Sequence, residues 1–580
     1  LEWKDGHEPS YSWAGGEVKR TTHAKQVSGT IREYYKMLYA EKEYDAGASR
    51  AILEEMGKTQ ITKAARKQLD KPITDQELQD VMEALPTGKQ AGPDRIPNEV
   101  YKYMSSFFAP KLGALIRRSI TKGQLPEEMR KGDICTLFKK GDRDEVRNYR
   151  PITLLQNSYK IFMRVLAKRM ASVVHQFVAE TQKGFVPHTF IADCTMLMNL
   201  VEAYINEGDD ESKKGLMVFL DMEKAFDRVS YDFLMGGLKT LGFGDHFMGT
   251  IGMMYNTTRP PQRRIYANGY YSDWFDIKSG VAQGCPLSPL LFLIVAQGLK
   301  AALDIKGVRG IDIKGLTLVL SQFADDTTLI LRSTDELKGA FEAIDMWCAA
   351  SAMRENMKKR EGLAMGMYRG ASWMDPDRQE RVRRRGTEGH KLAAGIKWAQ
   401  EGEWVVSLGV PIGNDMNHAR WWEKKIQATR DKANRWAGLY RSSFFGRNLV
   451  VQAMYFGRLR YWLWSLPMSK NVRTKVQTDA DRLWWSRDPI LDGAARRIKR
   501  FVAKRTAIGP KSKGGVNVMD WSNHVDAVQA SWVLKYLHPS KSLWKSLLDV
   551  IMFRDDEGRL ILGGERELLM CPLTRADKYR

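Results

Sequence analysis

The sequence is poor in the features that mark secreted, zinc-binding and membrane-spanning proteins. Only 5 of its 580 residues are cysteines, and none forms a C-x-x-C pair. Neither a zinc site nor a disulfide framework is therefore expected, and a reducing compartment is favoured. The longest unbroken apolar run, residues 290–296, is too short to cross a bilayer. The polar start Leu1-Glu2-Trp3 is no signal peptide, and without an initiating Met the chain is expected to be a piece of a longer polyprotein.

Acidic residues are also in deficit. The chain has 91 Lys and Arg against 69 Asp and Glu, which gives a formal net charge of +22. Such a charge predicts a polyanionic partner, either nucleic acid or an anionic membrane, and the missing apolar span favours nucleic acid. With 43% hydrophobic and 10% aromatic residues the chain is globular rather than disordered, and it is long enough for several domains.

Strand-like and helix-like segments alternate through the first two thirds of the chain. Strands are predicted at residues 134–138, 216–221 and 265–267, and helices at 158–178, 231–241 and 289–303. Thr74 with Glu77 three positions later predicts a capping box, and the charged run 378–386 predicts an exposed loop. Interleaved elements of this kind favour an α/β or α+β sheet domain. After Gly413-Asn414-Asp415 tryptophan and basic residues become dense and helical spacing dominates, so a domain boundary is placed there.

The most informative segment is Phe323-Ala324-Asp325-Asp326, which lies between the short apolar runs 316–320 and 328–331. Short runs of this composition read as strands, and Asp tolerates the geometry of a tight turn, so a hairpin is predicted. Two carboxylates about 4 Å apart repel by roughly 4 kcal/mol at an effective dielectric near 20. A divalent cation would remove that repulsion. An isolated Asp-Asp pair is more often a solvated turn, so a metal site needs support from other parts of the sequence.

Support comes from a second predicted strand, residues 216–221, whose last residue is Asp221. Three carboxylates from two strands would hold two Mg²⁺ ions about 3.5–4 Å apart. A third element, residues 280–292, combines glycines that permit close backbone approach with Ser288 and Pro289 as N-cap and first helical position. The apolar helix that follows is expected to be buried.

Taken in their order along the chain (residues 216–221, 280–292 and 323–326), the three blocks resemble the reverse transcriptase of a LINE-type (non-LTR) retrotransposon. Five further segments match motifs of that family: residues 88–99, Phe138-Lys139-Lys140-Gly141-Asp142, residues 148–155, Gln182-Lys183-Gly184-Phe185, and the primer-grip segment 408–413. The resemblance runs from about residue 73 to the C-terminal region. Together and in order, these motifs make a chance match very improbable.

The resemblance implies a right-hand polymerase, in which fingers and a palm of α/β character (an α+β palm) precede an α-helical thumb and a helical C-terminal region. The expected divisions are a helical N-terminal extension at 1–85, fingers and palm at 86–414 with core motifs at about 120–413, a basic thumb at 415–490, and a C-terminal helical region at 491–580 that is expected to be truncated. Most thumb aromatics are expected to be core, whereas basic residues such as Lys425 and Arg430 are expected to follow the duplex backbone.

The resemblance also implies roles residue by residue. Asp221 and Asp325 would be the main metal ligands and Asp326 a supporting carboxylate, with two Mg²⁺ ions as cofactors and Mn²⁺ as the alternative. Lys139 and Arg150 would contact the incoming triphosphate, with Lys140 as an alternative to Lys139. Phe226 would be the steric gate against the ribose 2′-hydroxyl, and Gln283 and Gly284 would line the nucleotide and template pocket. Lys359 would protonate pyrophosphate.

Each of these assignments has a simpler alternative. The lysines and Arg150 are also compatible with solvated surface charges, and Phe226 with an ordinary core aromatic. The sequence departs from the family pattern at Ala282, where a basic residue is common, and at Arg354-Glu355, which replaces a Gly-containing or apolar stretch. Both departures put template or nucleotide contact in doubt, but neither touches the acids.

The resemblance implies RNA-directed DNA synthesis from dNTPs on an RNA template, primed by a DNA 3′-hydroxyl or nicked target DNA. No membrane is expected among the partners, and the expected location is the nucleus and cytoplasm of a eukaryotic host cell. Two alternatives stay open: a nucleic-acid-binding protein whose catalysis has decayed, and an RNA-dependent RNA polymerase or intron-type maturase. No endonuclease is recognisable, and the sequence does not define target site, template or oligomeric state.

Overall fold

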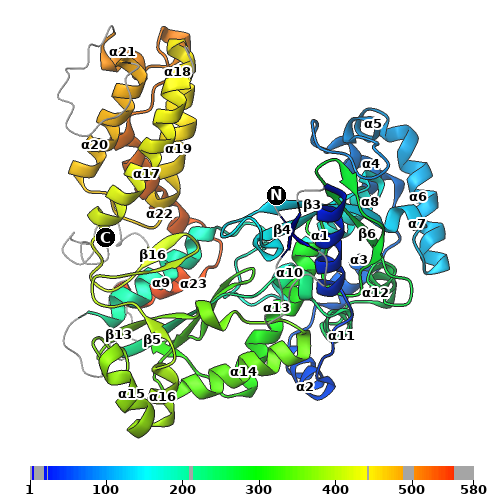
Figure 1. Cartoon of the computed structure of the whole chain (residues 1–580), viewed down its shortest axis with the longest axis horizontal. Coiled ribbons are helices and arrows are strands. Elements are labelled where there is room, and N and C mark those ends of the chain that lie inside the picture. The colour runs from blue at the N-terminus through cyan, green and yellow to red at the C-terminus, as the bar shows by residue number, and fades with distance from the viewer. Residues whose placement is uncertain are drawn as a thin grey trace.

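The computed structural model of the chain describes residues 3–5, 19–21, 24–207, 213–439, 443–486 and 502–553. Two arms rise from a common base (Figure 1). The base holds a central five-stranded sheet, one arm holds a second five-stranded sheet with the helices of the N-terminal third, and the other arm is helical. The mixture of helix and sheet agrees with the predicted fold class. Parts of the predicted N-terminal extension and C-terminal region, including residues 487–501 and 554–580, lie outside the described residues.

The central sheet is antiparallel except at one edge. Its strands in spatial order are β11 (Leu320–Phe323), β12 (Asp326–Leu331), β5 (Lys214–Leu220), β13 (Glu361–Gly366) and β14 (Lys397–Trp398), of which only β13 and β14 run parallel. Strand β5 lies in the middle and is buried from Gly215 to Leu220. A strand covered on both faces reads as a continuous apolar run, which is why this segment could be predicted from sequence.

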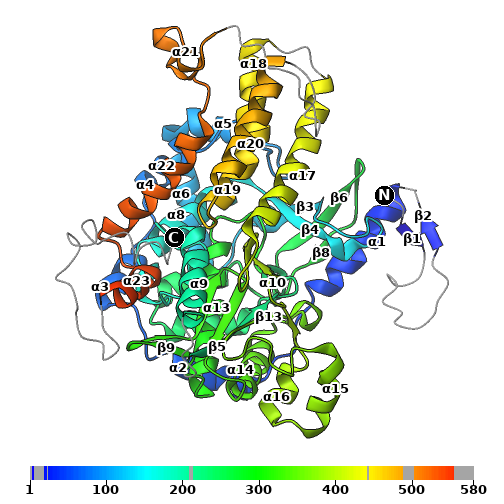
Figure 2. The same cartoon turned by 90° about the vertical axis from the view of Figure 1, so that its left-hand side faces the viewer.

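The two faces of the sheet are covered by different helices. Leu216 and Val218 belong to the cluster built around α13 (Ser288–Ile305) and α14 (Glu336–Ser351). Met217 and Phe219, which alternate with them, pack with α9 (Ile191–Ile205) and the C-terminal helix α23 (Leu543–Phe553). Figure 2 shows α23 beside α9, so the C-terminal segment returns to close the second face of the central sheet. This role could not be assigned from sequence.

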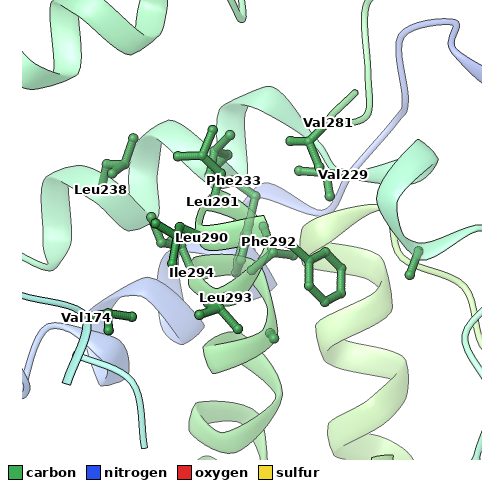
Figure 3. Packing of buried hydrophobic residues seen from close by; sticks show 14 of the residues in the cluster. Val174, Val229, Phe233, Leu238, Val281, Leu290, Leu291, Phe292, Leu293 and Ile294 are labelled. Atoms are coloured by element: carbon green, nitrogen blue, oxygen red, sulfur yellow. The ribbon is translucent and has the colours of Figure 1, made fainter. Parts of the chain in front are cut away.

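Helix α13 is the core of the base. Its residues from Leu290 to Leu299 are at most 7% exposed, and they pack among Val229, Phe233 and Val281 (Figure 3). A helix that is apolar on all sides is a buried helix. Within the described part of the chain, α13 is long and apolar enough to cross a membrane by length and composition, but 78% of it is buried inside the protein, as expected of a core helix. The helix begins at Ser288, with Leu287 and not Ser288 in the capping position, so the predicted N-cap was wrong by one residue.

The second sheet carries the motifs that precede the acids. Its strands are β4 (Tyr149–Leu155), β3 (Lys131–Phe138), β6 (Gln262–Ala267) and β7 (Tyr270–Tyr271), with β8 (Phe275–Asp276) also paired to β6. Helix α1 (Ala24–Leu38) packs on β6, β7 and β8, and α2 (Ala46–Met56) packs against α13 and α14. The N-terminal segment is therefore part of the same packed structure.

Further helices complete the base and this arm. They are α3 (Lys63–Leu69), α4 (Asp75–Glu83), α5 (Asn98–Tyr103), α6 (Ser105–Lys122), α7 (Glu127–Arg130), α8 (Asn157–Ala171), α10 (Ala225–Arg228), α11 (Tyr231–Thr240), α12 (Asp245–Gly252), α15 (Pro376–Arg385) and α16 (Glu388–Ala393). Three two-stranded sheets pair β1 (Trp3–Asp5) with β2 (Lys19–Thr21), β9 (Ile311–Ile313) with β10 (Leu316–Leu318), and β15 (Val405–Ser407) with β16 (Val410–Ile412).

The helical arm follows the last strand, β16. Its elements are α17 (His418–Leu439), α18 (Phe444–Val450), α19 (Gly457–Leu463), α20 (Lys470–Asp481), α21 (Lys504–Ile508) and α22 (Trp521–Leu537), with π-helical turns at Val451–Phe456 and Arg482–Ser486. Trp421 and Trp422 are 2% and 1% exposed in its core, as predicted. Arg430 was wrongly expected to follow nucleic acid, because its guanidinium is buried in an ion pair with Asp479 at 2.7 Å, to which the Tyr455 hydroxyl also donates.

Several element predictions are confirmed and others need correction. The capping box of Thr74 and Glu77 is present at the start of α4. The predicted helix 158–178 ends at Ala171, and the run 316–320 is divided between β10 and β11, which belong to different sheets. The charged run 378–386 is not a loop: most of it lies in α15, whose start is marked by Asp375 as N-cap and Pro376 in the first turn.

We expect Trp347→Ala to destabilise the base strongly. Trp347 is 2% exposed between α13 and α14, and its indole N–H donates to the Val295 carbonyl at 2.9 Å. Removing this ring leaves a cavity and deletes the indole hydrogen bond, which costs about 3–5 kcal/mol. Denaturant unfolding measures the loss. Leu534→Ala, at a side chain that is 70% exposed, serves as the control and should stay within about 0.5 kcal/mol of the wild type.

Candidate active site

The two Asp residues at 325 and 326 lie at the hairpin that the sequence predicts. Strands β11 and β12 pair antiparallel with Phe323 opposite Asp326, so Ala324 and Asp325 form a two-residue loop. Ala324 has a φ of +59°, which hairpin loops of this length require but which is strained for a residue with a Cβ. Strand β12 pairs with β5 with Thr327 opposite Leu220. The next residues outward in this register are Asp326 and Asp221, so the ladder brings the distant acid to the hairpin.

The strained loop is held by the segment that contains Gln182. The Ala324 N–H donates to the Gln182 side-chain oxygen at 2.8 Å, and the Gln182 side-chain nitrogen donates to the Ala324 carbonyl at 3.1 Å. Gly184 approaches the same peptide so closely that a Cβ there would lie 2.1 Å from the Ala324 nitrogen. The Q-x-G spacing therefore has a physical cause: the amide clamps the loop, and the glycine makes room for it.

The acids lie among positive side chains in one cleft. A cleft of about 520 Å³ is lined by all but one of the residues predicted for the site: Lys139, Arg150, Asp221, Phe226, Gln283, Gly284, Asp325 and Lys359, together with the alternative Lys140. Asp326 lines the adjoining cleft of about 440 Å³, and Lys139, Lys140, Asp221 and Lys359 line both clefts. Residues from widely separated parts of the chain thus converge as predicted.

The electrostatics of the acids reflect their crowding. Burial raises the pKa of Asp325, repulsion from Asp221 adds to the effect, and Lys139 and Arg150 oppose it. The pKa of Asp326 is raised to about 6, first by desolvation and then by Asp325 and Asp221. Water reaches Asp326 from the cleft and screens its neighbours, but burial and mutual repulsion raise the pKa of both carboxylates, so a nearby positive charge would stabilise their ionised forms.

Lys359 supplies some of that charge directly. Its ammonium lies 2.7 Å from the Asp221 carboxylate. The backbone beside it is fixed by a short ladder, in which Asn356 N–H donates to the Asp221 carbonyl and Glu223 N–H to the Arg354 carbonyl, each at 2.8 Å. Glu355 forms an ion pair with Arg360. Arg354 and Glu355, where the sequence departs from the family pattern, are therefore each paired locally, and the position of the acids does not change.

The loop 280–285 connects the cleft to the second sheet. Thr153 N–H of β4 donates to the Gln283 carbonyl at 2.7 Å. Gly284 has a φ of +131°, and a Cβ there would lie 2.3 Å from the Thr153 carbonyl, so only glycine fits. Phe226 is half-buried at the edge of the cleft and stacks on Phe292 with 4.8 Å between centroids. Phe226 is thus both packed against the core and presented to the cleft.

The hairpin of β15 and β16 closes the adjoining cleft. Its turn is Leu408-Gly409, with φ values of +50° and +77°. Two side chains of the helical arm hold this turn: Tyr461 donates its hydroxyl to the Leu408 carbonyl, and the Trp462 indole donates to the Gly409 carbonyl at 2.8 Å. The segment predicted as primer grip therefore lies between the central sheet and the helical arm.

One buried acid was missed. Asp227 is fully buried, and it accepts hydrogen bonds from the Tyr39 hydroxyl at 2.7 Å and from the Gln283 side-chain nitrogen at 3.0 and 3.1 Å. Burial raises its pKa to about 6, while Tyr39, Lys224 and Gln283 act in the opposite direction. A single Asp one position after Phe226 gives no signal in sequence, because its partners lie far away in the chain.

The donor set suits a divalent ion. Within the described part of the chain, no three His, Cys, Asp or Glu side chains are grouped as a ready-made cage. Mg²⁺ does not need one, because it is commonly bound by one or two carboxylates plus water and substrate phosphate. Asp221 and Asp325 in a single cleft, with raised pKa for Asp325 and cations on the facing wall, provide such a set. Asp326 adds a third carboxylate at the adjoining edge.

Comparison with known proteins identifies the class. Residues 138–399 match the family model described as reverse transcriptase (RNA-dependent DNA polymerase). The chain is 25% identical over 524 residues, 89% of its length, to the transposon TX1 uncharacterized 149 kDa protein of Xenopus laevis. It is 30% identical over 245 residues, 40% of its length, to the Pol polyprotein from type-1 retrotransposable element R2 of Popillia japonica. It is 24% identical over 297 residues, 50% of its length, to the RNA-directed DNA polymerase from mobile element jockey of Drosophila melanogaster. The matches cover 37%, 33% and 31% of these relatives, so the chain spans about a third of their length.

Residues 138–399, slightly less than half of the chain, thus match the reverse transcriptase family, whose domains have a palm-type polymerase fold. More narrowly, the predicted resemblance to non-LTR retrotransposon polymerases is confirmed by the R2 and jockey relatives, which match 40% and 50% of the chain. The TX1 transposon protein extends the similarity to 89% of the chain. Reverse transcriptases use divalent metal ions and act on a template, a primer and dNTPs, and the cleft described here lies within the matched residues.

We expect Gly184→Ala to destabilise the hairpin loop. The new methyl group would meet the Ala324 backbone at 2.1 Å, and backbone cannot move aside as a side-chain tip can. Overpacking of this kind costs about 1–3 kcal/mol, measurable as a lower melting temperature. Gly249→Ala is the matched control, because that exposed helical glycine has open space at its Cβ position and should gain up to about 1 kcal/mol. Equal melting temperatures for the two variants would contradict the close approach.

Proposed function

We propose that the chain is an RNA-directed DNA polymerase of a non-LTR retrotransposon, which transfers a nucleotide from a dNTP to a primer 3′-hydroxyl on an RNA template. The observation that carries the proposal is the convergence of Asp221, Asp325 and Asp326 through the β12–β5 ladder, beside a cleft lined by Lys139 and Arg150. The relatives named RNA-directed DNA polymerase support the same reaction.

The chain's own residues have distinct tasks in this reaction. Asp221 and Asp325 would hold two Mg²⁺ ions, or Mn²⁺, with Asp326 in support; such ions lower the pKa of an attacking hydroxyl and offset charge on the leaving group. Lys139 and Arg150 bind the triphosphate, and Arg150 can do so with two parallel hydrogen bonds. Lys140 lies on the same wall and is the alternative to Lys139. Lys359, now paired with Asp221, is placed to give a proton to pyrophosphate.

The proposal also assigns the parts of a right hand. The central sheet and its helices are the palm, the second sheet with its α-helices is the fingers, and α17 to α22 are the thumb. The division at residues 413–415 falls between the last strand, β16, and α17. The hold of Tyr461 and Trp462 on the turn at Leu408-Gly409 ties the thumb to the primer-grip hairpin, so movement of the thumb and placement of the primer end are coupled. The N-terminal extension packs on both the palm and the fingers.

The nucleic-acid partners follow from charge and chemistry. A net charge of +22 suits RNA and DNA backbones, whose contacts contribute affinity without reading sequence. RNA is the template, and a DNA primer or nicked target DNA supplies the 3′-hydroxyl. The relatives are transposon proteins of animals, which supports activity in a eukaryotic host cell. Within that cell, we propose the nucleus and cytoplasm as the location.

We expect Asp221→Asn and Asp325→Asn each to abolish primer extension on poly(rA)/oligo(dT) with Mg²⁺. Each change removes a negative ligand, and the loss of several kcal/mol of transition-state stabilisation corresponds to a rate decrease on the order of a thousandfold or more. RNA binding, measured by fluorescence anisotropy, should persist, because phosphate contacts lie elsewhere.

Asp273→Asn, at an exposed loop carboxylate outside the cleft, is the matched control and should retain wild-type extension. Extension that survives either cleft substitution would refute the site assignment. A wild-type protein that binds RNA but never extends a primer would instead favour the decayed binding protein.

We expect Phe226→Val to relax discrimination against ribonucleotides. Phe226 is held by stacking on Phe292, so its ring presents a fixed wall to the cleft. Replacing the ring by the smaller Val side chain opens the pocket and should lower the preference for dNTP over rNTP roughly ten- to hundredfold, since a pocket contact of this size is worth about 1–3 kcal/mol. The ratio of kcat/KM for dTTP and UTP measures the change.

Phe185→Ala is the comparison variant, because Phe185 is an aromatic residue of the same cleft that meets Phe226 edge-on at 5.8 Å. The nucleotide ratio of this variant should stay near that of the wild type. A wild-type enzyme that prefers UTP would show that the RNA-dependent RNA polymerase alternative is correct.

A further inference from the structure

The carboxylate of Asp227 has no part in the chemistry proposed above, yet it is fully buried beside the cleft. Burying a carboxylate is costly unless its oxygens are satisfied. Asp227 is satisfied by two side chains from distant segments: the Tyr39 hydroxyl at 2.7 Å and the Gln283 side-chain nitrogen at 3.0 and 3.1 Å. An arrangement of this kind either stabilises the fold or holds one of the partners in a required position.

The partner that matters is Gln283. Its backbone carbonyl already accepts the Thr153 N–H of β4, so the main chain is fixed. The side-chain amide could adopt either of two orientations, but an ionised carboxylate only accepts hydrogen bonds, so it selects the one in which the nitrogen faces Asp227. That choice leaves the amide oxygen as the acceptor that Gln283 offers to a ligand. The orientation of a cleft residue is thus set by Asp227.

Asp227 is in turn held by the N-terminal segment. Tyr39 follows α1 directly and lies far outside the matched residues 138–399. It is 4% exposed and stacks on Tyr35, and its carbonyl accepts the Lys278 N–H at 2.9 Å. The neighbouring Ala40 carbonyl accepts the Ser279 hydroxyl at 2.9 Å. These contacts anchor Tyr39 and the neighbouring Ala40 to the segment between β8 and the loop 280–285, so the Tyr39 hydroxyl is a rigid donor.

We infer that Tyr39 is a positioning residue of the nucleotide pocket, which acts through Asp227 to fix the side-chain orientation of Gln283. The inference rests on the proposed polymerase function, because Gln283 is taken to contact the incoming nucleotide. It makes the N-terminal segment part of the polymerase: a protein trimmed to the matched residues 138–399 would retain the acids but lose the donor that orients Gln283.

The test is steady-state extension on poly(rA)/oligo(dT) with varied dTTP, for Tyr39→Phe and Gln283→Ala singly and together. Tyr39→Phe removes one hydroxyl and keeps the ring. Loss of one hydrogen bond to a charged group should raise the KM for dTTP roughly three- to tenfold with little change in kcat. In the Gln283→Ala background the same change should have no further effect, since the two residues act in series.

Tyr231→Phe is the matched control. Tyr231 is equally buried near Asp227, but its hydroxyl faces the Ile277 carbonyl, so the KM for dTTP should stay at the wild-type value. A merely structural role for Tyr39 would lower the active fraction, and therefore kcat, without moving KM. If Tyr39→Phe does not fold, the KM and kcat for dTTP are measured for Asp227→Asn with and without Gln283→Ala. A raised KM with little change in kcat, seen only when Gln283 is present, again supports the inference.

The possible results separate the two claims. An unchanged KM in an active Tyr39→Phe enzyme, or equal effects of this change with Gln283 present and absent, overturns the inference alone. An inactive wild-type enzyme overturns the proposed function and the inference together. A raised KM that disappears in the Gln283→Ala background supports the inference.

Discussion

The geometry of the active-site acids depends on the pairing of β12 with β5. These strands are more than a hundred residues apart in sequence, and their antiparallel register sets Thr327 opposite Leu220. That register carries Asp326 and the loop residue Asp325 to the end of β5, where Asp221 lies. Because side chains alternate along a strand, a slip of one residue would turn the acids to the wrong face. The buried residues on both faces of β5 prevent such a slip, so the packing of the core fixes the geometry of the acids.

The rest of the molecule supports this edge of the sheet. Gln182 and Gly184 hold the strained peptide at Ala324, and strain of this kind persists only where the surroundings determine it fully. Helix α13 fills one face of the sheet, and α9 with α23 fills the other. The N-terminal helix α1 reaches the cleft through Tyr39. Segments from both ends of the described chain, outside the matched residues 138–399, therefore support the site: Tyr39 through Asp227 and α23 through the packing of the central sheet.

Sequence reasoning succeeded where the signal was local. The hairpin at 323–326, the capping box at Thr74 and the apolar helix α13 each depend on residues close together in the chain, and all three are present. It failed where partners are distant. Asp227 and Tyr39 are 188 positions apart, Gln182 and Ala324 are 142 apart, and Arg430 meets Asp479 across 49. Arg430 was misread for that reason, since nothing near it in sequence announces a buried carboxylate. The helix α15 was a different failure, because Asp375 and Pro376 do signal its start.

The family resemblance supplied roles that local physics could not, such as those of Lys139 and Phe226, and the structure supplied the contacts that make the roles chemically sensible. The central claim is that Asp221 and the 325–326 hairpin share divalent ions. Its most direct test is a crystal soaked with Mn²⁺ and a dNTP, examined for anomalous scattering at the manganese edge. The account predicts manganese peaks between the Asp221 and Asp325 carboxylates and next to the triphosphate. Peaks only elsewhere, with none between these two side chains, would contradict it.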